Sequence, residues 1–411
     1  MKLAIINAES GKGGGPATIA DDIYKNFVAD GNEAVVCFGR QCADDDVNRY
    51  RIGGKLDLLW HGFISRVFDA HGMASKSATQ KLVEFLKEYQ PDVVNLHNIH
   101  GYYLNYSILF KYLKEADIPV VWTLHDCWPF TGHCAYFDLV GCDKWKTGCH
   151  HCPQIKSYPA SFGLDTSKST YNRKKKIFSS IGKNLTLVPP SAWLGDLAKE
   201  SFLKDCRIEV INNGIDLNVF KPNRIDMASE ESFRKKHGLT DKVMVLALAS
   251  EWTPRKGFDD MIYIGTHLPE NYKLVMVGLS PEQLSQIPPE IIPITRTNNV
   301  EELIQIYSEA DVFANASVED NFPTVILESL ACGTPVVTYD TGGCREEINE
   351  KCGILVDKYD KAAIISGLIQ MGKKTDSVSE ACLEKTATFE KKKMYDRYNQ
   401  LFHDLVKSSV K

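Results

Sequence analysis

Short apolar runs alternate with helical patterns along nearly the whole chain of 411 residues. In the first half these runs cover 2–8, 34–38, 93–96, 120–124, 185–188 and 208–211. In the second half they cover 243–249, 273–277, 291–294, 312–314, 336–339 and 353–356. Strands buried on both faces appear as continuous apolar runs, and helices between them favour a parallel order. The sequence therefore predicts an α/β fold with two doubly wound sheets.

Length and charge restrict the class of protein. A chain this long exceeds one ordinary core, so we expect a first domain over 1–215, a second over 216–385 and a C-terminal helix within 386–411. The formal net charge of -5 argues against general nucleic-acid binding. No apolar run reaches the ~18 residues of a membrane span, and the N-terminus lacks the flanks of a signal peptide. These features predict a cytoplasmic protein.

The segment EDNFPTVILESLACGTP, residues 319–335, carries the clearest chemical pattern. Pro323 suits a first helical turn and Gly333 a C-cap, which predicts a helix over 324–331. A helical rise of about 1.5 Å per residue separates Asp320 from Glu328 by roughly 10 Å, about the length of a diphosphate with its flanking sugars. Unpaired amides at the helix start suit phosphate. The pattern predicts a sugar-nucleotide site.

This motif resembles the signature of the retaining GT-B glycosyltransferases of the family 4 (group 1) type. In that family the first acid of the motif is usually Glu. This chain has Asp320 eight residues before Glu328, and Glu319 directly precedes Asp320. Spacing favours Asp320 as the acid that meets the donor sugar, and Glu319 stays the alternative. The resemblance implies two Rossmann-like domains facing a central cleft, a C-terminal helix that crosses back to the first domain, a nucleotide-sugar donor and retention of anomeric configuration. We expect the donor to be a UDP- or GDP-sugar. It implies no cofactor for catalysis.

Further donor-site residues follow from loops at predicted strand ends. Arg255 and Lys256 lie between a strand and a helix, where a guanidinium and an ammonium suit a diphosphate. The resemblance assigns both to the donor, extends the donor site to Asn213 in the N-G-I-D segment, and places Phe322, Pro323 and Thr324 beside the nucleotide sugar. It also places a glycine-rich loop after the first strand, which here contains Gly14 and Gly15. That loop matches neither a Walker loop nor GxGxxG.

Histidines cluster after two neighbouring predicted strands of the first domain. His97 and His100 follow the run 93–96, and His125 with Asp126 follows the run 120–124. Ligands of open parallel sheets bind at the carboxyl ends of the strands, so these side chains are candidates for the cleft. The resemblance often places a histidine here near the reacting centre, which makes His125 the preferred catalytic candidate, with Asp126 beside it.

A cysteine-rich insertion over 127–159 interrupts the alternation. Cys149 and Cys152 have the spacing of a zinc knuckle, and Cys134 and Cys142 would complete a four-sulfur site for a structural zinc. Reduced thiols without a metal, or a redox pair, are the alternatives. The segment HDCWPFTGHC with its clustered cysteines resembles bacterial exopolysaccharide glycosyltransferases, including those of colanic-acid type.

The basic run Arg173 to Lys176 is either a solvated helix face or a contact with anionic lipid headgroups. With the resemblance, the chain is predicted to transfer a sugar to a saccharide or lipid-linked acceptor in exopolysaccharide, capsule or cell-surface glycan synthesis, with a peripheral contact to the cytoplasmic face of the inner membrane and no nucleic-acid partner. Two alternatives are a non-catalytic sugar-nucleotide-binding protein and a GT-B enzyme of another class, such as an epimerase.

Overall fold

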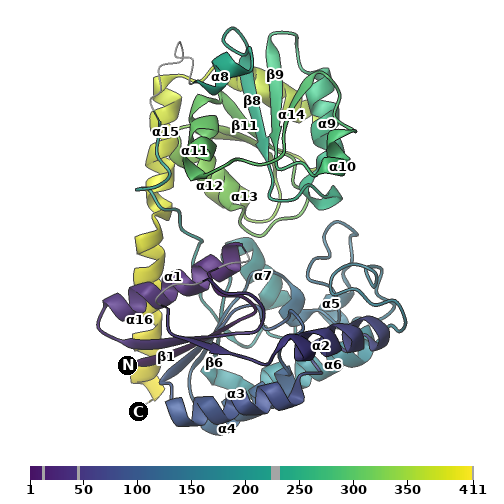
Figure 1. Ribbon diagram of the computed structural model, residues 1–411, viewed down its shortest axis with the longest axis vertical. Helices are drawn as coiled ribbons and strands as arrows, with labels where there is room; N and C mark the ends of the chain where they lie inside the picture. Colours follow the sequence, from purple (N-terminus) through teal and green to yellow (C-terminus); the bar gives the residue numbers. More distant parts are fainter. Residues whose placement is uncertain (12–13, 44–46, 224–231, 410–411) are drawn as a thin grey trace. The chain divides into compact units, whose positions relative to one another are not determined.

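The computed structural model describes residues 1–411 except 12–13, 44–46, 224–231 and 410–411. It divides the chain into two compact units, the first formed by Met1–Ile211 with Tyr395–Lys411 and the second by Asn212–Met394. Each unit is an α/β body with its own parallel sheet (Figure 1). The predicted α/β class with two doubly wound sheets is confirmed.

The sheet of the first unit has the order β3-β2-β1-β4-β5-β6-β7, and the paired strands run parallel. Its strands are β1 (Lys2–Asn7), β2 (Glu33–Phe38), β3 (Arg49–Arg51), β4 (Val93–Leu96), β5 (Val120–Thr123), β6 (Leu185–Val188) and β7 (Arg207–Ile208). Its helices are α1 (Gly15–Ala29), α2 (Lys55–Phe68), α3 (Lys76–Tyr89), α4 (Tyr106–Ala116), η1 (Trp128–Phe130), α5 (Lys144–Thr147), α6 (Ser167–Phe178), η2 (Ser179–Asn184) and α7 (Ala192–Glu200).

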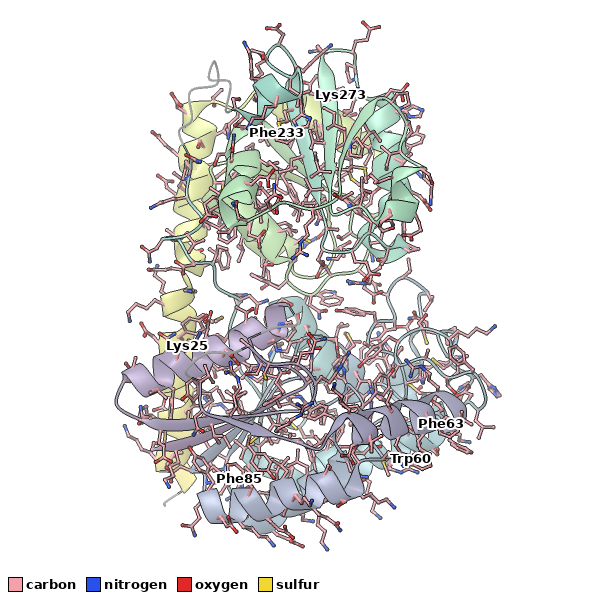
Figure 2. The ribbon with its side chains drawn as sticks, in the orientation of Figure 1. Lys25, Trp60, Phe63, Phe85, Phe233 and Lys273 are labelled. Atoms are coloured by element: carbon pink, nitrogen blue, oxygen red, sulfur yellow. The ribbon has the colours of Figure 1, made fainter. Side chains whose placement is uncertain are left out.

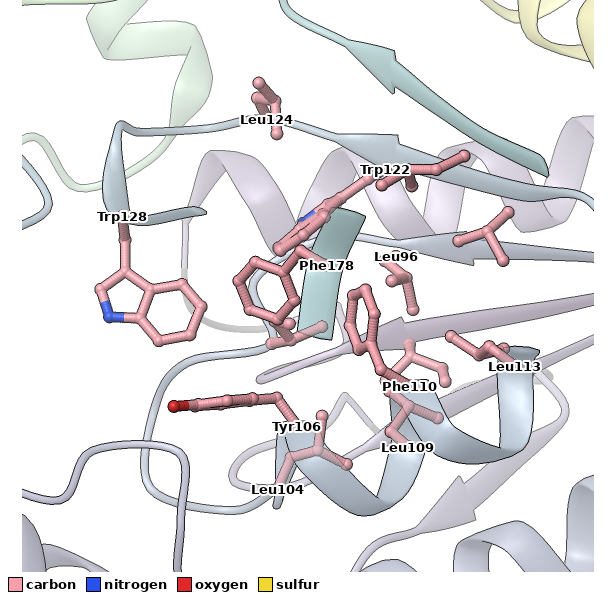
Figure 3. Packing of buried hydrophobic residues seen from close by; sticks show 14 of the residues in the cluster. Leu96, Leu104, Tyr106, Leu109, Phe110, Leu113, Trp122, Leu124, Trp128 and Phe178 are labelled. Atoms are coloured by element: carbon pink, nitrogen blue, oxygen red, sulfur yellow. The ribbon is translucent and has the colours of Figure 1, made fainter. Parts of the chain in front are cut away.

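An aromatic core fixes the central strands of this sheet against its helices. Phe178 of α6 lies edge-on to Trp122 of β5, with ring centroids 5.0 Å apart, and 4.5 Å from Phe110 of α4 (Figure 3). The Trp122 indole also donates to the His97 carbonyl at 3.0 Å. Aromatic burial of this kind stabilises a core strongly, and the indole hydrogen bond holds the loop after β4 in place.

The sheet of the second unit has the order β10-β9-β8-β11-β12-β13 and is also parallel. Its strands are β8 (Val243–Leu248), β9 (Tyr272–Val277), β10 (Ile291–Ile294), β11 (Val312–Asn315), β12 (Val336–Tyr339) and β13 (Gly353–Val356). Its helices are α8 (Phe233–Lys236), η3 (Pro254–Lys256), α9 (Phe258–His267), α10 (Pro281–Leu284), α11 (Val300–Glu309), α12 (Thr324–Ala331), α13 (Cys344–Glu347), α14 (Lys361–Met371), α15 (Asp376–Thr386) and η4 (Ala387–Phe389).

Two apolar clusters cover the two faces of this second sheet. One includes side chains of α11, α12 and α15, and the other includes side chains of α9 and α14. Strands covered on both faces explain why β8, β11 and β12 are continuous apolar runs. The loops at the carboxyl edge are left to carry polar chemistry.

The last helix, α16 (Lys391–Ser409), begins in the second unit and belongs to the first from Tyr395 onward. Its start is held by a hydrogen bond from the Lys391 amide to the Ile215 carbonyl at 2.9 Å. In the first unit the Tyr395 hydroxyl donates to Asp22 at 2.8 Å, and the Phe402 ring packs edge-on against Phe27. The unit boundaries therefore fall at 211 and 394.

The basic residues 173–176 of α6 differ in burial. Lys174 is fully buried, its ammonium donating to the Trp128 carbonyl at 2.7 Å and lying 3.3 Å from the centre of that ring, while Lys175 and Lys176 are exposed. The interpretation of Arg173 to Lys176 as one lipid-facing cluster is therefore wrong for Lys174, because one residue in four along a helix turns inward. No helix in the described part of the chain has both the length and the apolar character needed to cross a membrane.

Candidate active site

The loop after β8 brings Arg255 and Lys256 to the carboxyl edge of the second sheet. The Thr253 side chain accepts from the Lys256 amide and starts the short helix η3, so both basic residues lie in one fixed turn. Gly257 follows with φ of 73°, and a Cβ there would lie 2.1 Å from the Ala316 carbonyl oxygen. Only glycine permits this close approach between the two loops.

The acidic loop after β11 meets this basic turn. The Arg255 guanidinium donates to the Glu319 carbonyl at 2.7 Å, and the Val318 amide donates to the Arg255 carbonyl at 2.9 Å. The Lys256 ammonium forms an ion pair with the Asp320 carboxylate, and both side chains are mostly buried. Residues 64 positions apart are thus joined, and Asp320, not the Glu319 side chain, is the acid paired with the loop lysine.

Helix α12 begins directly after this acid. Pro323 is its N-cap and supplies no side-chain hydrogen bond. The Ile326 amide donates to the Pro323 carbonyl at 3.0 Å, which leaves the Thr324 and Val325 amides of the first turn for another acceptor. Phe322 is buried in a small apolar cluster with Ile215 and Leu327, where it packs against Phe389 at 5.7 Å. The structure therefore places Phe322 in the packing that supports the helix start, with Thr324 as the first helical residue.

Glu328 lies one helical turn before the end of α12. The Tyr307 hydroxyl of α11 donates to its Oε2 at 3.0 Å. Burial raises the pKa of Glu328 to about 7, although the hydrogen bonds from Tyr307 and Thr324 oppose that rise. The carboxyl group therefore changes charge near neutral pH, which is unusual for a glutamate and typical of a functional position.

Two polar residues that the sequence patterns did not single out lie beside Asp320. Thr341 and Glu347 are buried, and neither the Thr341 hydroxyl nor the Glu347 carboxyl oxygens have a hydrogen-bond partner among the described residues. Burial, together with the Asp320 carboxylate, raises the pKa of Glu347 well above its ordinary value. The loop between them is close-packed, because a Cβ on Gly342 would lie 1.6 Å from the Asp320 carbonyl oxygen. Buried groups without partners are costly, so they mark a place where a polar ligand or water fits.

In the first unit, His125 lies at the end of a relay of neutral groups. Its Nε2 is 2.9 Å from His97 Nδ1, and His97 Nε2 is 2.9 Å from Asn95 Oδ1. Because the amide oxygen of Asn95 can only accept, His97 carries its hydrogen on Nε2, and His125 must donate from Nε2. Burial lowers the pKa of His125 to about 4. His125 is therefore a neutral ring at pH 7 that carries its hydrogen on Nε2.

Asp126 has hydrogen-bond partners other than its neighbour His125. Its Oδ2 is 2.9 Å from His100 Nε2, and its Oδ1 accepts from the Trp128 amide at 2.9 Å. Burial alone would raise the pKa of Asp126, but these partners outweigh it and hold the pKa below its ordinary value. His100 Nδ1 in turn lies 2.9 Å from the exposed Tyr158 hydroxyl. Asp126 thus anchors a Tyr158–His100 pair within the first unit.

The remaining donor-site candidates occupy less defined positions. Gly14 is the N-cap of α1 with φ of 89°, and Gly15 begins the helix; a Cβ on either would meet open space. Residues 12–13 of the same loop lie outside the described residues. Asn213 is half-buried in the second unit, one position after Asn212, whose amide is 3.4 Å from Glu346. The two glycines and Asn213 lie in different units.

The four cysteines proposed for zinc, Cys134, Cys142, Cys149 and Cys152, line one small cavity beside Trp145. A thiol hydrogen bond from Cys134 lowers the pKa of Cys152 to about 7 and raises that of Cys134. The chemistry of four thiols around one space fits zinc, yet the described residues include no group of three or more His, Cys, Asp or Glu side chains arranged to hold a metal ion. The zinc site stays a prediction.

Aromatic side chains of the insertion belong to the core of the first unit. Phe137 stacks on Trp145 at 4.8 Å, Phe130 lies 5.4 Å from Trp145, and all three belong to the main cluster of the first unit. Aromatic packing therefore ties this segment to the core of the first unit.

Comparison with known proteins agrees with this geometry. The family model "Glycosyltransferase Family 4" matches residues 13–219, and "Glycosyl transferases group 1" matches residues 229–387. A colanic acid biosynthesis glycosyl transferase of Escherichia coli, WcaC, is 27% identical over 299 residues, which are 69% of this chain and 67% of the relative. A D-inositol 3-phosphate glycosyltransferase of a Mycobacterium species is 30% identical over 198 residues, 44% of each chain.

Solved structures share the fold. Sucrose-phosphate synthase of Thermosynechococcus elongatus superimposes with a TM-score of 0.69 at 15% identity, with 99% of each chain covered. The Anabaena protein Alr3699/HepE, solved in complex with UDP, gives a TM-score of 0.66 at 18% identity and covers 98% of this chain and all of its own. The chain belongs to the group 1, family 4 type of glycosyltransferases with the GT-B fold.

Proposed function

We propose that the protein transfers a sugar from a UDP- or GDP-sugar to a saccharide or lipid-linked acceptor, with retention of anomeric configuration. The observation that carries this proposal is the cluster at the carboxyl edge of the second sheet, where Lys256 and Asp320 meet at the uncapped start of α12 and Glu328 lies further along the same helix. The cation and the helix amides suit a diphosphate, and the carboxylates suit sugar hydroxyls.

The residues of the second unit supply what departure of a nucleoside diphosphate requires. Negative charge grows on the leaving phosphate, and Lys256, Arg255 and the first-turn amides of α12 would stabilise it in the transition state. With donor bound, Lys256 would exchange part of its contact with Asp320 for a phosphate oxygen, which frees Asp320 to accept a sugar hydroxyl. Two cations beside helix amides provide the neutralisation, so we expect turnover without an added metal ion.

Glu328 and the two orphaned polar residues extend the donor site. An ionised Glu328 offers two acceptor oxygens to a ribose diol, held in place by Tyr307. Thr341 and Glu347 are buried without partners beside Asp320, and donor hydroxyls would supply the missing hydrogen bonds. In the first unit, the neutral His125 ring would help to orient a sugar, and the exposed Tyr158 ring offers a surface on which an acceptor sugar can stack.

Retention needs no side-chain nucleophile in this scheme. The acceptor hydroxyl attacks the face from which the diphosphate leaves, the bond from the anomeric carbon to the phosphate oxygen breaks, and the leaving phosphate takes the hydroxyl proton. The relationship to WcaC, named for colanic acid biosynthesis, supports a role in exopolysaccharide, capsule or cell-surface glycan synthesis. The proposal includes a peripheral contact with the cytoplasmic face of the inner membrane.

Proton NMR of slow donor hydrolysis without acceptor tests the catalytic and stereochemical parts together. A retaining transferase should release the sugar first as the anomer present in the donor, and Lys256→Ala should abolish the release. Lys273→Ala is the matched control, because Lys273 lies at the amino end of β9, away from the loops that carry the site (Figure 2). Release of the opposite anomer would refute retention. Donor binding without any hydrolysis would favour a non-catalytic sugar-nucleotide-binding protein.

A further inference from the structure

Helix α2 has its apolar face turned outward. Its buried residues are His61, Gly62 and Ser65, which are polar or small. At 100° per residue the opposite face carries a stripe about 100° wide, formed by Leu56, Leu59, Trp60, Phe63 and Val67. These five side chains are exposed, Leu56 to 81% and Leu59 to 71%, and the Trp60 and Phe63 rings stack at 5.8 Å (Figure 2). A helix at the surface of a globular domain normally shows the reverse arrangement.

The inward face of α2 is held by polar contacts. His61 Nδ1 lies 2.8 Å from the Ser75 hydroxyl, and His61 Nε2 accepts from the Gly72 amide at 3.0 Å. Asp57 caps the helix by accepting from the Gly54 amide at 2.8 Å. These bonds fix which side of the helix faces the domain, so the outward apolar stripe is a built feature of the fold.

A second apolar segment continues the stripe at the end of α2. The Phe162 amide donates to the Arg66 carbonyl at 2.8 Å, and a Cβ on Gly163 would lie 2.4 Å from the Val67 carbonyl oxygen. Phe162 is 73% exposed, and Leu164 is exposed beside it. The stripe and this loop together form one surface, called here the α2 face: Leu56, Leu59, Trp60, Phe63, Val67, Phe162 and Leu164. A contiguous apolar patch of this kind marks an interaction site.

Charge around the α2 face is one-sided. Segments 55–69 and 156–168 contain four exposed lysine and arginine side chains, Lys55, Arg66, Lys156 and Lys168. None of the four forms an ion pair with another described residue. The acids of the same segments are committed to the protein, Asp57 to the cap described above, Asp69 to His133 at 2.7 Å, and Asp165 to the Cys152 and Ser167 amides. Lys55 places a positive charge at the positive end of the helix dipole, which is unfavourable for the helix. Helix stability therefore does not explain a lysine at this position.

We propose that the α2 face docks the protein on an anionic lipid surface. A helix face of Trp, Phe and Leu flanked by exposed bases has the composition that inserts at the headgroup boundary. A second copy fits less well, because a twofold interface would bring two sets of these bases together while the acids of the same segments are already hydrogen-bonded within the protein. The inference deepens the proposed function by naming the surface that meets the membrane of a lipid-linked acceptor.

Vesicle sedimentation tests the docking of the α2 face on lipid without donor or acceptor. A failure of the docking proposal can therefore be distinguished from a failure of the proposed donor site. Wild type should sediment with vesicles of phosphatidylglycerol and phosphatidylcholine and much less with phosphatidylcholine alone. The double variant W60S/F63S should bind at least about tenfold more weakly, and K55A/K168A about fivefold more weakly for each lysine removed. The matched control Y359S/I369S removes two exposed apolar side chains of the second unit and should bind like wild type.

Trp60 reports its own insertion. It is the exposed tryptophan of the six, the others being buried or half-buried. Brominated lipids should quench its emission in wild type, and W60F should keep vesicle binding while losing that quenching. Absence of wild-type binding to anionic vesicles, or equal binding by W60S/F63S, would overturn the proposal. A lipid-free dimer in analytical ultracentrifugation that W60S/F63S dissociates would assign the α2 face to a second copy instead. Melting temperatures of all variants establish that they are folded.

Discussion

The raised pKa of Glu328 makes donor affinity depend on pH in a way that an ordinary glutamate would not. If the ribose hydroxyls bind the ionised carboxylate, affinity follows the fraction ionised. With the pKa at about 7, that fraction is about three quarters at pH 7.5 and about 3% at pH 5.5, a change of about 25-fold in affinity. An ordinary pKa of 4.5 would give a change of about 1.1-fold over the same interval.

Isothermal titration calorimetry with an intact nucleotide sugar measures this directly, because its diphosphate has no ionisation near neutral pH. Affinity should fall as the pH drops from 7.5 to 5.5 in wild type and stay nearly constant in Glu328→Gln, which is weak at both values. Tyr307→Phe is the second variant, since loss of the hydroxyl that donates to the carboxylate should raise the pKa and move the midpoint to higher pH. Equal wild-type affinity at both pH values, or an unchanged pH dependence in Glu328→Gln, would refute binding of the ribose by ionised Glu328.

Three further outcomes are expected. Lys256→Ala and Glu328→Ala should each lower turnover at least about a hundredfold, about 2.7 kcal/mol, in steady-state assays where Lys273→Ala keeps wild-type rates; near-normal turnover in either would refute the site. Glu347→Gln should gain melting temperature relative to wild type as the pH rises from 5 to 8, because a carboxyl with a raised pKa loses its stabilisation as it ionises; a constant difference in scanning calorimetry would contradict this. Elemental analysis of tag-free, reduced protein should find close to one zinc per chain, and its absence would refute the four-cysteine site.

The strands were predictable because both faces of each sheet are covered. β1, β4, β5, β8 and β12 appear as short apolar runs, and α12 has its proline at the start and its glycine after the end, as the sequence predicts. The meeting of Lys256 with Asp320 was predictable only in part. The spacing of strands placed both loops at one sheet edge, but the ion pair between them depends on the close contact that Gly257 makes with Ala316.

Other features could not be predicted from local patterns. Helix α2 carries an amphipathic stripe, but a stripe does not say whether it faces the core. Here the inward face is held by the hydrogen bonds of His61 to Ser75 and Gly72. The sequence identifies His125 and Asp126 as neighbours, whereas in the bend after β5 they contact different partners, His97 and His100. Thr341 and Glu347 gave no signal, because an orphaned polar group becomes evident only when burial is known.

The donor site itself is tested by a calorimetric screen of UDP, GDP and ADP and their hexose conjugates against wild type and Lys256→Ala, with Lys273→Ala as control. One nucleotide should bind tightly to wild type and to Lys273→Ala, and its affinity should fall at least about tenfold in Lys256→Ala because a charged phosphate contact is lost. Failure of all of them to bind wild type, or tight binding unaffected by Lys256→Ala, would contradict the donor site at the carboxyl edge of the second sheet.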